Sequence, residues 1–206
     1  MTDPYARLLD RWRSVVPDAD DLARDLLSRY GESHRLYHDH RHLLEVLDAV
    51  DELAGSAGDL RVVRLAAWFH DAVYDPRTGD NEERSAVLAT AMLPAPLGDA
   101  VARLVRLTTM HAPGSSDIDG AVLCDADLAV LGAPPQRYAA YAADVRREYA
   151  HVTDDAFRAA RSQILHQLVR GSIYTTETAR RRWGAQAKRN VERELSELGG
   201  DAVPLR

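Results

Sequence analysis

Histidines and acidic residues occupy core-facing positions in several segments of this sequence that have helical periodicity. His38 and His42 are spaced one helical turn apart, and an apolar helical face continues after them. His70 and Asp71 directly follow the apolar run 66–69. Burying an ionisable side chain is costly unless the side chain is paired or binds a metal. These four residues are therefore candidates for a metal site or an acid–base site.

Two further segments carry ionisable residues in apolar surroundings. His111 extends the apolar face of segment 97–111, next to a Pro-Gly pair. Asp125 and Asp127 lie in segment 118–131, which is apolar nearly all round and is therefore expected to be buried. Residues two positions apart cannot share a helical face, so spacing leaves open which aspartate faces a metal. A helix-end role for the histidine, and capping or ion pairing for the aspartates, are the structural alternatives.

The elements that must position these residues are helices, because helical periodicity recurs along the chain and strand-like alternation is scarce. Helices are predicted over about 3–16, 18–30, 38–53, 59–74, 81–93, 97–111, 118–131, 136–149, 154–169 and 177–198. The expected fold is all-α, with about ten helices in a single domain spanning residues 1–206 and a metal site between core helices.

Length and composition exclude several classes of protein. The chain has 206 residues, a formal charge of −6 and one cysteine, Cys124. One cysteine excludes a disulfide framework, and the acidic balance disfavours a nucleic-acid polymer as partner. Apolar runs are interrupted by charge well before ~18 residues, so no membrane partner is expected. The start of the chain does not resemble a signal peptide, which predicts a cytoplasmic protein, and a homo-oligomer stays open.

Taken in order, the motifs resemble those of the HD-domain superfamily of metal-dependent phosphohydrolases. The matching elements are Tyr37-His38-x-x-x-His42, Phe69-His70-Asp71 and Asp125-Ala-Asp127-Leu128. A small bacterial group of predicted metal-dependent HD phosphohydrolases is more similar still, over about residues 30–195. The elements shared with that group are Arg35-Leu-Tyr-His38, His70-Asp-Ala-Val-Tyr-Asp75, Asn81-Glu-Glu-Arg-Ser-Ala86, Thr108-Thr-Met-His111 and Asp125-Ala-Asp-Leu128.

The resemblance implies a helical HD fold with one or two divalent metal ions per chain. His42, His70, Asp71 and one aspartate of segment 118–131 would be the ligands. Within the superfamily the Ala-Asp-x-Leu form favours Asp127, with Asp125 as the alternative. Two imidazoles and two carboxylates suit a divalent transition metal, but they leave the choice among Mn, Mg, Fe, Ni and Zn open.

Further roles follow from the same resemblance. In cyclic-nucleotide phosphodiesterases a similar element makes the first histidine a general acid, which implies that His38 protonates the leaving alkoxide. Glu82 would orient a ligand or act as a base, and His111 is a candidate ligand for a second metal. An anionic substrate approaching a protein of charge −6 needs local positive charge, and Arg35 and Lys188 are the candidates for binding it.

The implied function is a metal-dependent phosphohydrolase, either a phosphomonoesterase or a phosphodiesterase. Its substrate would be a small phosphorylated molecule such as a nucleotide, attacked by metal-activated water. Two alternatives remain. One is a di-iron oxygenase, which would use the same scaffold with more histidine ligands. The other is a non-catalytic binding module that a metal stabilises.

Overall fold

The computed structural model describes residues 4–199, which form ten α-helices, two short 3-10 helices and no strand. The expected all-α architecture is confirmed. Asp3, the expected cap of the first helix, lies outside the described residues. The helices are α1 (Pro4–Val15), α2 (Asp20–Tyr30), α3 (His40–Glu52), η1 (Ala54–Ser56), α4 (Leu60–Phe69), α5 (Asn81–Met92), α6 (Leu97–Leu107), α7 (Ile118–Asp127), η2 (Leu128–Gly132), α8 (Pro135–Glu148), α9 (Asp154–Arg170) and α10 (Glu177–Glu197).

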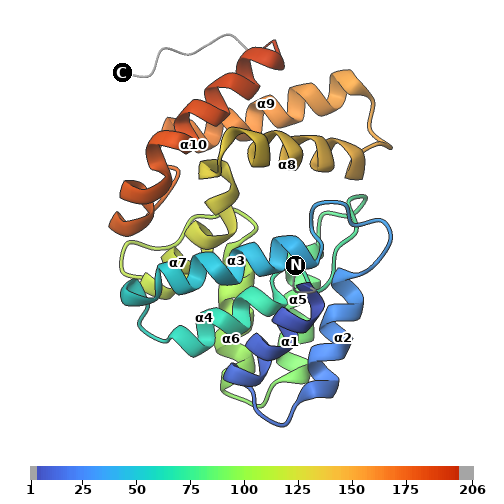
Figure 1. The fold of residues 1–206 in the computed structure, drawn as a ribbon, viewed down its shortest axis with the longest axis vertical. Helices are drawn as coiled ribbons and strands as arrows, with labels where there is room; N and C mark the ends of the chain where they lie inside the picture. Colours follow the sequence, from blue (N-terminus) through green and yellow to red (C-terminus); the bar gives the residue numbers. More distant parts are fainter. Residues whose placement is uncertain (1–3, 200–206) are drawn as a thin grey trace.

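Helices α8, α9 and α10 lie together at one end of the molecule, and α1 to α7 form the rest (Figure 1). The apolar core runs through both parts. Its largest buried side chains include Trp12 on α1 and Trp68 on α4, whose rings meet edge to face with centroids 5.1 Å apart. A smaller apolar cluster lies between α9 and α10. Among the helices of residues 4–199, none is long and apolar enough to cross a membrane.

Three predicted helix boundaries near the candidate site are wrong. Helix α4 ends at Phe69 instead of about Tyr74, and α6 ends at Leu107 instead of His111. Helix α3 begins at His40 because the side chain of Asp39 accepts hydrogen bonds from the N–H groups of the first turn. Most of the candidate residues therefore lie at or just beyond helix ends, where the chain turns and side chains from different helices can converge.

The predicted reason for the proximity of His38 and His42 is also wrong. His38 precedes α3, and the extended backbone of Asp39 separates it from the helix. The two imidazole rings are nevertheless close, with centroids 5.5 Å apart. The turn before the helix, and not a shared helical face, brings them together.

Candidate metal and acid–base site

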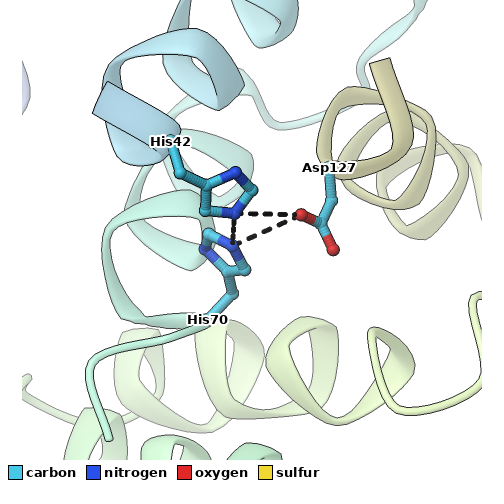
Figure 2. Close-up of side chains that lie close together, drawn as sticks. All are labelled: His42, His70 and Asp127. Atoms are coloured by element: carbon cyan, nitrogen blue, oxygen red, sulfur yellow. Dashed lines mark hydrogen bonds and ion pairs between the residues drawn. The ribbon is translucent and has the colours of Figure 1, made fainter. Parts of the chain in front are cut away.

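Three side chains from three different helices converge in the interior. His42 comes from the first turn of α3, His70 directly follows α4, and Asp127 is the last residue of α7. The Nε2 atoms of the two histidines are 3.0 Å apart, and Asp127 Oδ1 lies 3.2 Å from the first and 3.5 Å from the second (Figure 2). The three residues form a group that could hold a metal ion.

The separations of these atoms fit a shared metal ion. Ligand atoms bonded at about 2.0–2.2 Å to one ion stand roughly 3.0–3.5 Å apart when the angle between them is a right angle or tetrahedral. The orientation of His70 fits as well, because its Nδ1 lies 2.8 Å from the carbonyl oxygen of Ala67. That nitrogen must donate a proton to a carbonyl, so Nε2 keeps the lone pair that a metal ligand needs.

Asp71 lies against the same two nitrogens. Its Oδ2 is 3.3 Å from Nε2 of His42 and 3.1 Å from Nε2 of His70. The structure thus brings together all four residues that the resemblance implies as ligands. The group whose ligand atoms all lie close to one another consists of His42, His70 and Asp127. Asp71 is a neighbour of that group and could supply a fourth ligand.

The electrostatics of the cluster favour a cation. Burial tends to raise the pKa of Asp71 and of Asp127, but the charge of His70, together with hydrogen bonds and charges of the neighbouring histidines, outweighs burial and holds both pKa values well below the ordinary range. Burial tends to lower the pKa of His42, yet the hydrogen bonds that its ring can donate to the carboxylates of Asp127 and Asp71 raise it to about 9. Two protonated imidazoles 3.0 Å apart would repel each other. One shared divalent ion would neutralise the carboxylates without that repulsion.

Asp125, the alternative ligand, has a different set of partners. It is almost fully buried, and its two carboxylate oxygens accept hydrogen bonds from the N–H groups of Thr175 and Thr176, each at 2.7 Å. Asp125 therefore fixes the start of α10, and the structure does not bring it into the cluster.

His111 contacts the cluster from outside. Its Nε2 lies 2.7 Å from Oδ2 of Asp127, the carboxylate oxygen that faces away from the two other histidines. The backbone of His111 is left-handed, with φ of 47°, a conformation that is uncommon for a residue other than glycine and costs on the order of 1 kcal/mol. His111 orients Asp127 and is the residue that could extend the site to a second ion.

Glu148, which the sequence analysis did not single out, organises the region around His38. One carboxylate oxygen accepts the three consecutive backbone N–H groups of residues 36–38, at 2.7, 2.8 and 3.0 Å. The other lies 2.7 Å from Nδ1 of His38 and accepts the hydroxyl hydrogen bond of Tyr74 at 2.9 Å. Burial would raise the pKa of Glu148, but the hydrogen bond and charge of His38 lower it to about 2.

A sequence signal for Glu148 exists. Tyr138, Tyr141, Val145 and Glu148 are the buried residues of α8, and their spacing of three and four places them on one helical face. The criterion that singles out His70 and Asp127, an ionisable residue that continues an apolar face, therefore also applies to Glu148. The prediction for segment 136–149 stopped at its helical periodicity and did not apply this criterion to Glu148.

A cavity of about 290 Å³ borders the cluster, and we call it the acid–base cavity. Its lining includes His38, Asp71, Glu82, His111, Asp127 and Tyr149. Glu82 and Asp127 therefore line the same cavity, which is compatible with the role near the metal site that the resemblance implies for Glu82. No lysine or arginine is among the described residues of this lining.

The two residues expected to bind substrate have other contacts. The side chain of Arg35 is fully buried, and it donates to the carbonyl oxygens of Asp71 at 2.6 Å and of Ala72 and His38 at 3.3 Å. It positions the backbone of the site and is not available to a substrate. Lys188 is exposed on α10, where its contact is Glu192, one turn further along the helix, at 4.0 Å. Burial of its side chain contradicts the expected substrate-binding role of Arg35. Lys188 is not in the lining of the acid–base cavity, and its expected role stays a prediction.

Comparisons of the chain with protein-family models, with curated proteins and with solved structures found no match.

Proposed function

We propose that the protein is a metal-dependent phosphohydrolase that acts on a small phosphoester. One observation carries the proposal. The His42–His70–Asp127 group lies beside the hydrogen-bonded pair of His38 and Glu148. Both border the acid–base cavity, the group through Asp127 and the pair through His38. A metal site next to an oriented proton donor is what hydrolysis of a phosphoester requires.

The residues of the chain would divide the work as follows. When bound, a divalent ion lowers the pKa of a coordinated water and neutralises charge on a phosphoryl oxygen. His42, His70, Asp71 and Asp127 would hold the ion. His38 would give a proton to the leaving alkoxide from Nε2, since its Nδ1 is engaged by Glu148. Glu148 is a positioning residue, because it fixes the ring and the backbone of His38.

The lining of the acid–base cavity also indicates the charge of the substrate. Asp71, Glu82 and Asp127 bring three carboxylates to the cavity, and no lysine or arginine among its described lining residues offsets them. A substrate with a single phosphoryl group suits this cavity better than a di- or triphosphate, because the ion would compensate one phosphoryl group and the described lining offers a further phosphate no lysine or arginine.

Elemental analysis of the purified protein, followed by assay of the metal-restored protein on a panel of phosphomonoesters and phosphodiesters, tests the proposal. We expect one or two equivalents of a divalent metal and phosphate release from at least one ester. Two iron atoms per chain with oxygen consumption would favour the di-iron alternative. Metal-dependent stability without turnover of any ester would favour the binding module.

Leaving-group dependence tests the proton donor. In a His38→Asn variant we expect hydrolysis of alkyl phosphoesters to fall about a hundredfold or more. Hydrolysis of p-nitrophenyl phosphate should change much less, because nitrophenolate leaves without a proton. An equal loss on both kinds of substrate would contradict a proton-donor role for His38. His166→Asn is the matched control, since this α9 histidine forms hydrogen bonds only with Ser162 among the described residues and is not in the lining of the acid–base cavity.

A further inference from the structure

A second cavity, larger than the acid–base cavity, runs along α3, and we call it the α3 groove. Its volume is about 490 Å³, within the range of small-molecule sites. The α3 residues in its lining begin at His42 and end at Glu52, a distance of about 15 Å along a helix. Asp127 lines both cavities, so the α3 groove begins beside the proposed metal site.

The walls of the α3 groove offer an apolar slot with an aromatic face. The apolar lining includes Tyr37, Val46, Ala49, Ala129, Val130 and Trp183. Trp183 lies on α10 and is half-buried, and its ring packs against Tyr174 with centroids 5.6 Å apart. Its position is fixed by Gly132, where an added Cβ would stand 2.9 Å from the carbonyl oxygen of Trp183. The indole is therefore held at the groove and keeps part of its surface accessible.

The charged groups of the groove disfavour an anion. Four carboxylates and two guanidinium groups are in its lining. Three of the carboxylates are paired with arginines: Glu45 with Arg137, Asp48 with Arg11, and Glu52 with Arg182. Because both guanidinium groups of the described lining are already paired with carboxylates, a phosphate group would find no unpaired cation here, whereas the carboxylate oxygens can still accept N–H hydrogen bonds from a neutral ligand.

Hydrogen-bond donors are available in the same walls. Arg137 uses Nε and Nη2 for Glu45, at 2.7 and 2.6 Å, while its Nη1 is buried without a hydrogen-bond partner in the described structure. The indole N–H of Trp183 likewise has no hydrogen-bond partner within residues 4–199. A ligand with an acceptor atom would satisfy a donor that otherwise carries a desolvation cost.

We propose that the α3 groove binds an uncharged planar ring that carries both N–H donors and acceptor atoms, as the organic part of the phosphoester. The ring would stack on Trp183 and donate to the carboxylates, and an acceptor atom of the ring would reach the buried Nη1 of Arg137 once that side chain turns toward the groove. That the ring belongs to the substrate rests on the proposed function, whereas binding of the ring rests on the groove alone.

Titration of the metal-free full-length chain with the nucleosides adenosine, guanosine, cytidine and uridine tests ring binding without any turnover. Ribose is the control ligand. We expect at least one nucleoside to bind with a Kd of about 1 mM or tighter and to change tryptophan emission, because Trp12 and Trp68 are fully buried and Trp183 is not. Absence of nucleoside binding at this concentration would overturn the inference.

Two variants locate the binding. Trp183→Leu should weaken binding about fivefold or more, the loss expected for one stacked ring. Ala129→Phe places a bulky ring in the groove at a half-exposed position and should weaken binding at least as much. Ala139→Phe, on an exposed face of α8 outside the groove lining, is the matched control and should leave binding unchanged. Equal binding by the wild-type and Ala129→Phe proteins would overturn the inference.

Failure of the inference and failure of the proposed function give different results. If Ala129→Phe abolishes nucleoside binding but no phosphoester is hydrolysed with any metal, the assignment of the α3 groove would stand and the proposed phosphohydrolase function would be overturned. If planar-ring and aliphatic phosphoesters are hydrolysed with the same kcat/KM, and Ala129→Phe changes neither, the hydrolase would stand and the groove assignment would be overturned.

Discussion

Two buried groups of charged side chains satisfy their charges in different ways. Between α9 and α10, Arg161 donates to both oxygens of Glu194, at 2.8 and 3.1 Å, and Tyr138 donates its hydroxyl to the same carboxylate. The guanidinium also lies 5.0 Å from the ring centre of Tyr141. Each charge in this group has an opposite charge in the fold itself.

The His42–His70–Asp127 group has no such internal balance. Two Nε2 atoms face each other at 3.0 Å, and the carboxylates of Asp71 and Asp127 lie within 3.5 Å of them. Only protonation of closely spaced imidazoles, or an added cation, can compensate those carboxylates. The comparison separates a buried ion pair whose charges balance within the fold from a buried group that could hold a metal ion.

The largest effect is expected from a substitution that disrupts the His42–His70–Asp127 group. His70→Ala should remove the metal and lower phosphate release about a thousandfold or more, because the ion contributes several kcal/mol to the transition state. Elemental analysis and the phosphoester assay measure the two effects, and circular dichroism checks that the variant folds. Full metal content in the folded variant would contradict the ligand assignment. His166→Ala should alter neither measurement.

The next largest effect is expected from a substitution that disrupts the buried pair of Arg161 and Glu194. Arg161→Met should lower the free energy of unfolding by about 3–5 kcal/mol, because it leaves Glu194 buried without its partner. Urea denaturation measures the loss. Replacing Glu194 by Leu in the same chain should recover part of the stability. The metal content should stay at the wild-type value throughout, and a variant that loses metal would contradict the separation of the two groups.

A third prediction concerns pH and Glu148. Its pKa of about 2 in the folded protein lies below the ordinary value of 4.5. The stabilisation is therefore present above about pH 4.5 and is lost as the pH falls towards 2. We expect about 2 kcal/mol after allowing for solvent screening. Unfolding of wild type and Glu148→Gln across this range measures it, and parallel curves would contradict the assignment.

The smallest effect is expected for Asp125, which contrasts with Asp127 on the same helix, α7. Asp125→Asn should lower the free energy of unfolding by about 1 kcal/mol, the size of a lost capping interaction, and leave the metal content unchanged. Asp127→Asn should instead reduce the metal content. Elemental analysis of the two variants side by side is the measurement, and the opposite pattern would show that the ligand has been misassigned.

The candidate residues could be found in the sequence because burial imposes a pattern. His42, His70 and Asp127 are ionisable residues at the ends of apolar faces, and the ordered motifs indicated that they act together. The number and kind of helices could be predicted for the same reason, since apolar periodicity reflects which side of each helix faces the core.

Other features depend on contacts between segments far apart in the chain. Glu148 reaches the backbone of residues 36–38 across more than a hundred positions, and no local pattern encodes that contact. The burial of Arg35 against carbonyl oxygens is likewise a property of the assembled fold. Arginines that bind a substrate and arginines that position a backbone have the same local sequence signature.

The sequence by itself determined the helical class, the set of ionisable residues placed in apolar surroundings and their order along the chain. Only the tertiary structure decided which of them meet. It ended α4 at Phe69 and began α3 just after Asp39, it gave Asp125 to the start of α10, and it left Asp127 to the histidines. The physical reason is that periodicity records whether a side chain is buried, whereas its partner is set by how the helices pack.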